Sequence, residues 1–346
     1  PAMLLPIADA PMFIQADPLG FPGTAFQGAS FYSASNPEVG AVITWFVKDD
    51  YKSLKKKRIA EEKKLQEAGK HVPFPTHEQL KREANEVEPS LLFVISDSEG
   101  RALRKIKKPV KAGVQRFVWD FRTSRFGPIE LSGPSNPAPW DEPERGWMVP
   151  PGTYTVTMHL LQDGKLTPMG SPQSAKCRPL HEASIPPAEQ VALRAFNEKA
   201  AALSRAISAA DAHRGQLNDV LPYLEAAVMS LTTVGEDQLA ELSAIKSRLK
   251  EIDEALNGDA LLPKFEGQSR MSLKGRTDLI IGSLWSTTAG PTGTYERAYD
   301  EARASFGKVL ADLRAVHDRT QAFETRLEQA GAPYTPGRMP VWVDAK

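Results

Sequence analysis

The period of the apolar positions changes once along the chain, near residue 180. Before this point apolar and polar side chains alternate, which is the period of a half-buried β-strand. In Pro151–Leu160, for example, Tyr154, Val156 and Met158 fall on one side of the predicted strand. After this point apolar residues recur every three or four positions, as in an amphipathic helix. The sequence therefore predicts a β-domain followed by a helical domain.

The strand that organises the first half is Gly113–Arg122, in which Phe117, Trp119 and Phe121 fall at every second position. Three aromatic rings on one face are suited to a core between two packed sheets. Counted from Ala41, the alternating runs and their turns predict six or seven strands. We therefore predict an immunoglobulin-like or fibronectin type III-like β-sandwich over residues 1–182.

A charged excursion interrupts this β-domain at about residues 50–88. Tyr51–Glu67 has the composition of a helix, and Thr76–Gln79 is a capping box that begins a second one. The basic run Lys55–Arg58 has two interpretations, a solvated helix face or a site for a polyanion. We favour the solvated face because acidic residues follow at pairing distance. The excursion is predicted to be a helical insertion.

The second domain is predicted to be an antiparallel helical bundle over residues 183–346. Its apolar residues form a continuous seam in three stretches, 193–231, 239–256 and 295–327. Pro222 lies within the first stretch, so we expect a kink or a helix restart near Asp219–Leu221. The tail from Gly331 to Trp342 is rich in proline and glycine and is predicted to wrap back over the bundle.

Composition narrows the classes of partner. Basic and acidic residues number 43 each among 346 residues, so no net charge favours nucleic acid or an anionic membrane. Arg101–Lys111 is strongly basic, but it lacks interleaved aromatic residues, and we interpret it as a protected sheet edge. No apolar run approaches the roughly 20 residues that span a bilayer. We expect no nucleic-acid partner and no membrane span, and we interpret Pro1–Met3 as the start of a processed or cloned fragment.

A search for reactive groups finds no assembled motif. The six histidines lack metal-binding spacing, and the chain contains neither a nucleophile elbow nor a phosphate-binding loop. Its one cysteine, Cys177, excludes an internal disulfide framework and is interpreted as a structural thiol. We therefore expect no catalytic residue, no metal and no cofactor.

Two loops carry candidate binding residues. The connection 123–150 contains Trp140, Asp141 and Trp147 as candidate binding residues. The two tryptophans would stack on sugar rings or anchor a partner; alternatively, they cover one end of the β-domain or the interface between the two domains. Gly282–Thr294 joins two helices and contains Trp285, Thr287 and Thr292, a second candidate ligand or partner site. Free backbone donors at the start of the last helix would hold an anion there, or a threonine caps that helix.

Several segments occur in an order that resembles a known family. They are Asn36–Thr44, the charged insertion with Pro73–Thr76, Val118–Arg122, Pro150–Val156, Gly282–Gly293 and Gly331–Arg338. Together they resemble the C-terminal, non-propeller region of bacterial secreted proteins with sortilin-like, BNR-repeat β-propellers, often labelled glycosyl hydrolase-like. The resemblance implies an extracytoplasmic location, and an N-terminal β-propeller of the parent protein as partner. It carries over no catalytic residue, because the hydrolase label would belong to the propeller.

These observations lead to three functional expectations. The first is a non-catalytic accessory module that scaffolds the propeller or contacts another protein. The second is a carbohydrate-binding or glycoside-hydrolase-associated module in which the loop with Trp140 and Trp147 binds a polysaccharide. The third, less favoured, is polyanion binding through Lys55–Arg58 and Arg101–Lys111.

Overall fold

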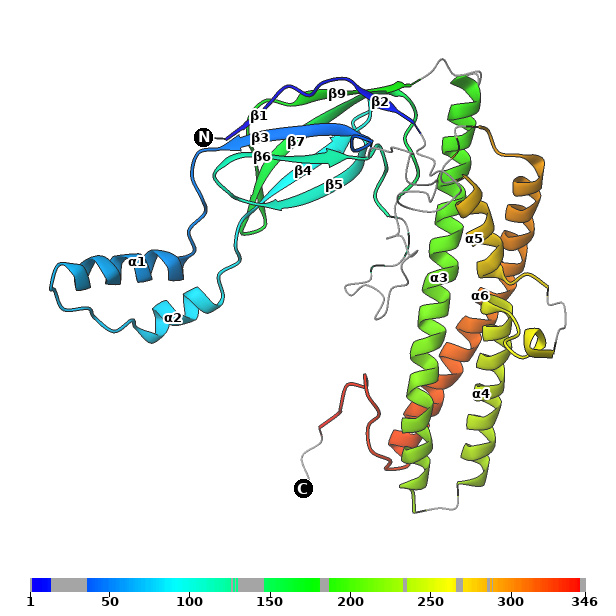
Figure 1. Cartoon of the computed structure of the whole chain (residues 1–346). Coiled ribbons are helices and arrows are strands. Elements are labelled where there is room, and N and C mark those ends of the chain that lie inside the picture. Colours follow the sequence, from blue (N-terminus) through cyan, green and yellow to red (C-terminus); the bar gives the residue numbers. More distant parts are fainter. Residues whose placement is uncertain are drawn as a thin grey trace, which may run out of the picture. The chain divides into compact units, whose positions relative to one another are not determined.

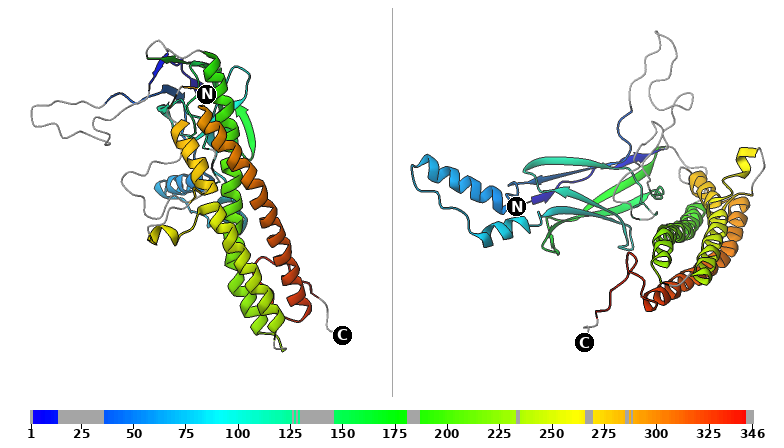
Figure 2. Two further views of the ribbon diagram at one scale, coloured as in Figure 1. Left: turned by 90° about the vertical axis from the view of Figure 1, so that its right-hand side faces the viewer. Right: turned by 90° about the horizontal axis from the view of Figure 1, so that it is seen from below.

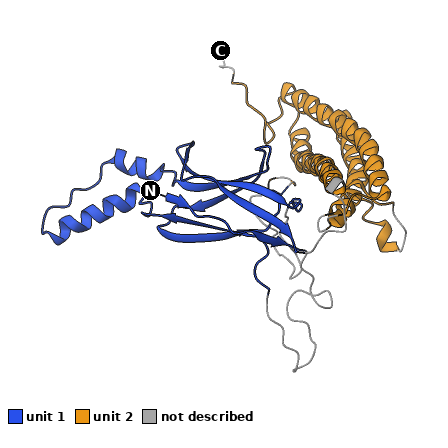
Figure 3. Cartoon of the chain, turned by 90° about the horizontal axis from the view of Figure 1, so that it is seen from above, with its two compact units in different colours: residues 1–125, 145–186 blue, residues 126–144, 187–346 orange. Residues whose placement is uncertain are grey.

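The computed structural model describes residues 2–13, 36–125, 127, 129, 146–180, 187–232, 235–265, 270–284, 287 and 289–342. The chain divides into two compact units (Figures 1 and 3). Unit 1 comprises residues 1–125 and 145–186, and unit 2 comprises residues 126–144 and 187–346. Among the described residues, unit 1 holds the β-strands and two α-helices, and unit 2 holds the remaining α-helices. The prediction of a β-rich first half and a helical second half is confirmed.

Unit 1 contains two β-sheets. One has three strands in the order β1-β3-β6, namely Ala2–Leu4, Ala41–Val47 and Gly113–Trp119. The other has the order β2-β9-β7-β4-β5, with β8 beside β7; these strands are Ala10–Met12, Gln173–Pro179, Gly152–Gln162, Ser90–Ser96, Ala102–Pro109 and Lys165–Pro168. Paired strands are antiparallel, except that β2 runs parallel to β9.

The inner faces of the two sheets pack against each other through aromatic rings. Trp45 and Phe117 belong to the three-stranded sheet, and Phe93 belongs to the other. The ring centroids of Trp45 and Phe93 lie 4.8 Å apart, and those of Phe93 and Phe117 lie 5.1 Å apart. Alternate residues of β3 and β7 are buried in the same core, as their two-residue period predicts.

The predicted strand Gly113–Arg122 ends earlier than expected. β6 stops at Trp119, and Phe121 takes a left-handed backbone with φ of 56°. The Asp120 carboxylate accepts a hydrogen bond from the Arg122 N–H at 3.2 Å, a local turn that competes with strand geometry. Phe121 is nevertheless fully buried, with its ring 5.2 Å from that of Trp119. The aromatic cluster is therefore built from a strand and a turn.

The described part of unit 2 is a bundle of α-helices (Figures 1 and 2). They are α3 (Pro187–Met229), α4 (Glu236–Asn257), α5 (Leu273–Leu284) and α6 (Gly293–Gln329), with a 3₁₀ turn η2 at Leu262–Phe265. Ion pairs fix the direction of α4: Arg214 of α3 bonds Asp253 near its end, and Arg326 of α6 bonds Glu241 near its start. α4 is therefore antiparallel to both α3 and α6. The helices meet along the leucine-rich seam that the sequence pattern predicts.

Of the two alternatives predicted near Asp219–Leu221, a kink or a helix restart, the restart is wrong. α3 continues without interruption for 43 residues, with Pro222 inside it. Leu217, Leu221, Leu224 and Val228 are buried on both sides of the proline. The free energy gained by burying this stripe offsets the loss of the backbone hydrogen bond that proline cannot donate.

The described part of the tail folds back on the end of α6. Ala332 joins the helical core, and the Thr335 hydroxyl donates a hydrogen bond of 3.1 Å to the buried Glu324 carboxylate. The Arg338 guanidinium binds both carboxylate oxygens of Glu328, at 2.6 and 2.8 Å. These contacts connect the tail to the last turns of the helix.

Candidate functional site

The residues predicted for the first loop are only partly described. Trp140 and Asp141 lie outside the described residues. Trp147 is half-buried, and its carbonyl accepts a 3.0 Å hydrogen bond from the Thr123 N–H. The next residues continue this pairing, since the Val149 N–H donates to the Phe121 carbonyl at 2.8 Å. Trp147 therefore belongs to a backbone ladder at the edge of the core, and the glycan site stays a prediction.

The second predicted loop uses its donors and acceptors locally. Trp285 lies outside the described residues. The Thr287 hydroxyl accepts a 3.1 Å hydrogen bond from the Ala289 N–H, and the Gly290 N–H donates to the Glu189 carboxylate at 3.4 Å. Thr292 occupies the N-cap position of α6, but its side chain makes no capping hydrogen bond. One donor of the proposed anion site is thus bound to a carboxylate of the chain itself.

The helical insertion offers a more distinct candidate surface. It consists of α1 (Leu54–Glu67) and α2 (His77–Ala84), which lie outside the two sheets (Figure 1). We call residues 53–87 the α1–α2 arm. Ser53 caps α1 by accepting a hydrogen bond from the Lys56 N–H, and Thr76 forms a full capping box with Gln79. These local caps explain why both helices begin where they do.

A carboxylate at the base of the arm connects its two ends. Glu86, just after α2, accepts hydrogen bonds from the Tyr51 hydroxyl at 2.5 Å and from the Leu54 N–H at 2.8 Å. Leu54 is the first residue of α1, whose first turn has no acidic residue of its own. Glu86 therefore supplies the negative charge that a helix N-terminus favours. The hydrogen bond to Glu86, with a smaller contribution from burial, raises the pKa of Tyr51 to about 12.

The two helices of the arm are connected through one guanidinium. Arg58 of α1 binds both carboxylate oxygens of Glu83 on α2, at 2.7 and 3.0 Å, and also Glu62 on its own helix at 2.6 Å. These bonds raise the pKa of Arg58, and the Arg58 bond lowers the pKa of Glu83. The pairing is a bidentate arrangement that fixes the relative orientation of the two helices.

The arm leaves most of its large apolar side chains exposed to solvent. Neither helix contains a buried residue. Its exposed large apolar residues are Leu54, Ile59, Phe74, Leu80 and Val87. Phe74 is 87% exposed. The sequence indicated the two helices through their caps and charges, but it gave no signal that the insertion would bury nothing.

A hollow of about 790 Å³ lies at the base of the arm. It is lined by residues that begin α1 and end α2, together with Gln162 and Asp163 of the β7–β8 turn. Both signs of charge face it, with Lys57 and Arg82 among the bases and Glu78 among the acids. This mixture is suited to a protein surface of mixed charge and does not select one small ion.

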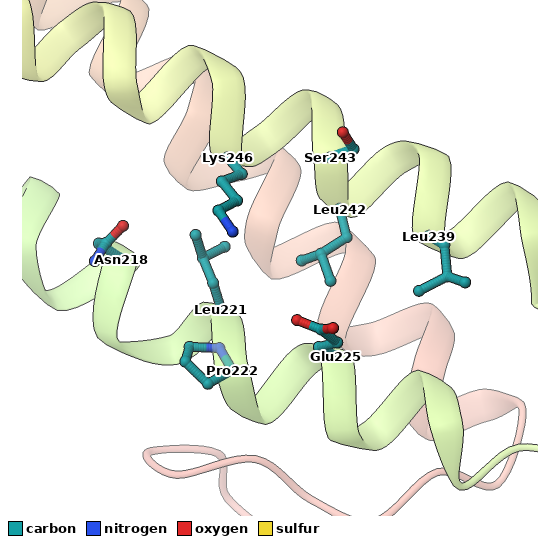
Figure 4. Close-up of a pocket in the computed structure, with 8 residues that line it drawn as sticks. All are labelled: Asn218, Leu221, Pro222, Glu225, Leu239, Leu242, Ser243 and Lys246. Atoms are coloured by element: carbon teal, nitrogen blue, oxygen red, sulfur yellow. The ribbon is translucent and has the colours of Figure 1, made fainter.

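A smaller hollow of about 330 Å³ lies between α3 and α4 (Figure 4). Pro222 on its α3 side has no N–H, so the Asn218 carbonyl loses its usual helical donor. Glu225 and Lys246 point into the hollow from opposite helices, over leucine side chains that form its floor. It is a surface groove of the bundle with polar groups along its rim.

The described residues show no reactive constellation. Among them no group of three or more histidine, cysteine, aspartate or glutamate side chains is placed to hold a metal ion. Cys177 is buried in the β-core, and this burial raises the pKa of its thiol to about 12. A protonated, inaccessible thiol is a poor nucleophile. Within the same set of residues no helix has both the length and the apolarity to cross a bilayer.

The chain was compared with models of protein families, with curated proteins and with solved structures, and none of the three comparisons finds a match.

Proposed function

We propose that the chain is a non-catalytic interaction module in which the α1–α2 arm contacts another protein surface. The observation that carries this proposal is that the arm is ordered but buries none of its helical residues. Helices of 14 and 8 residues are marginally stable in water when isolated. The contacts that hold them, an exposed capping box and ion pairs, each contribute little. A partner that covered the exposed apolar side chains would supply the missing burial.

The charges of the arm indicate what this partner surface is like. α1 has the sequence LKKKRIAEEKKLQE, in which basic residues outnumber acidic ones by six to three. Ile59 lies within this helix, and Phe74 lies in the loop between the two helices. The complementary surface is therefore an apolar patch bordered by carboxylates.

The identity of the partner and the location of the chain rest on the resemblance described above. We propose that the partner is the β-propeller of a secreted parent protein, and that the chain works outside the cytoplasm. We also propose an immunoglobulin-like or fibronectin type III-like arrangement for unit 1. The face-to-face packing of its two sheets supports this arrangement. A parent reading frame that encodes no propeller would contradict the assignment of the partner.

The test is a double substitution that removes two of the five exposed large apolar side chains of the arm without touching a core. We expect Ile59→Ser with Phe74→Ser to weaken binding to the parent's β-propeller at least tenfold in calorimetry, with unchanged thermal stability of the free chain. Tyr223→Ser, at an exposed position of α3, is the matched control and should bind like wild type. Equal affinity of the double variant and wild type would contradict the role of the arm.

A further inference from the structure

A second hollow in unit 2, of about 380 Å³, lies between α3 and α6 and has a different chemical character from the groove beside Pro222. Its floor is made of the core residues Ala210, Phe306 and Leu313, all of which are buried. Ala206 and Ala209 form the α3 side, where their small side chains leave space beside α6. One wall of the hollow is thus lined by methyl groups only.

Nitrogen groups gather at one end of this hollow. His213 of α3 and His317 of α6 face each other, with His213 Nε2 and His317 Nδ1 3.0 Å apart. Arg314, one turn before His317 on α6, also lines the hollow. The lining contains no aspartate or glutamate. Within the described part of the chain, the Arg314 guanidinium has no ion-pair partner.

The histidine pair retains a donor for a ligand. A hydrogen bond between two neutral imidazoles uses one N–H and one lone pair. If His213 Nε2 donates, His317 carries its other proton on Nε2; if His317 Nδ1 donates, His213 carries its other proton on Nδ1. In either tautomer, one ring N–H remains outside this bond. This N–H and the Arg314 guanidinium together are suited to a carboxylate, which accepts hydrogen bonds at both oxygens.

We propose that this groove binds a small amphipathic carboxylate, with its head at Arg314 and the histidine pair and its apolar tail along the alanine side. α3 and α6 run parallel here, because Phe196 contacts Tyr299 and, further along both helices, His213 contacts His317. The seven helical steps from Ala206 to His213 span about 10 Å at the helical rise, which suits a medium-chain acid. The charge of the lining selects an anionic head over a neutral or cationic one.

The test uses three ligands of equal tail length and different heads on the full chain. Titration calorimetry with octanoate, octanol and octylamine, in buffer containing EDTA, should show binding of octanoate at least tenfold tighter than that of the other two. Absence of octanoate binding would overturn the proposal. Equal binding of octylamine would overturn the assignment of the head.

Matched variants locate the site. Arg314→Gln should weaken octanoate binding about tenfold, as expected for the loss of one charge-assisted hydrogen bond, whereas Arg303→Gln on the same helix should have no effect. Ala209→Leu should fill the hollow and abolish binding, whereas Ala202→Leu, at another exposed position of α3, should not. Octanoate binding that survives both Arg314→Gln and Ala209→Leu would show that it binds elsewhere, and would overturn the proposal.

Discussion

Two buried tryptophans in the core of unit 1 differ in one hydrogen bond. The Trp119 indole N–H donates to the Arg122 carbonyl at 2.9 Å. The Trp45 indole N–H is buried and has no partner among the described residues. An unsatisfied buried donor costs free energy in the native state, so its removal recovers part of what a smaller side chain loses. The tilted packing of Trp45 on Phe93 shows that this ring is placed for its apolar contacts.

This difference predicts unequal effects of the same substitution. Trp119→Phe should lower the free energy of unfolding by about 1–3 kcal/mol more than Trp45→Phe, because it removes a satisfied hydrogen bond as well as apolar area. Urea denaturation of the two variants and wild type measures this. Equal losses in the two variants would mean that the Trp45 N–H is also satisfied in solution.

Cys177 predicts how the stability of unit 1 depends on alkaline pH. Burial raises the pKa of its thiol from 9.0 to about 12. Between these values the unfolded chain has lost the thiol proton while the folded chain retains it. The stability contributed by the neutral thiol is therefore complete below pH 9 and falls as pH rises toward 12, by at most about 1.4 kcal/mol per pH unit.

The measurement is the difference between wild type and Cys177→Ala in unfolding free energy, taken at pH 8 and at pH 10.5. The variant lacks the titrating group, so the difference between the two proteins should shrink at the higher pH. A difference that does not change with pH would show that the thiol titrates normally in the folded chain.

At the scale of elements, Pro222 and the arm show where local rules and packing disagree. Proline inside a helix removes one backbone hydrogen bond, and local rules therefore predict a break. α3 continues because its leucine stripe is buried on both sides of the proline. The arm is the opposite case, since capping residues begin both of its helices but neither helix contains a buried residue.

Replacing the interior proline should stabilise unit 2. Pro222→Ala restores an N–H for the Asn218 carbonyl, and we expect it to raise the free energy of unfolding by about 1–2 kcal/mol, less than the full helical penalty because the unfolded chain also gains freedom. Pro187→Ala is the control, because Pro187 is the first residue of α3, where the N–H is not needed. Calorimetric unfolding of both variants tests this, and destabilisation by Pro222→Ala would contradict it.

The bond between Arg58 and Glu83 should contribute to the order of the arm. Arg58→Gln removes the guanidinium that binds α2, so trypsin should cleave the arm faster than in wild type, even though the variant has one site fewer. Lys63→Gln, which removes only an exposed pair with Glu67, should leave the remaining sites as resistant as before. Acidification should have the same effect as Arg58→Gln. The hydrogen bond from Arg58 lowers the pKa of Glu83, so the stability that the ionised carboxylate gives the arm is lost as pH falls through that pKa. Equal cleavage rates of wild type and Arg58→Gln would contradict this role.

At the scale of the whole molecule, much of the architecture was predictable from the sequence, because the architecture depends on the spacing of apolar residues and on local helix caps. The two-residue period of β7 and the three-to-four-residue seam of α3 are direct signals of which side chains are buried. The left-handed backbone of Phe121 was not predictable from the spacing of apolar residues, because it depends on the turn in which Asp120 accepts a hydrogen bond from the Arg122 N–H. The groove beside His213 and His317 was also missed, since 104 residues separate the two histidines and only the parallel pairing of their helices brings them together.

The central claim is that the α1–α2 arm, which buries none of its helical residues in the described part of the chain, contacts another protein. Hydrogen exchange of the arm amides, measured in the free chain and in its complex with the proposed β-propeller partner, tests this most directly. The account predicts rapid exchange throughout α1 and α2 in the free chain and slower exchange in the complex, with unchanged protection of β4 and β7. Equal exchange of the arm in both states would contradict it.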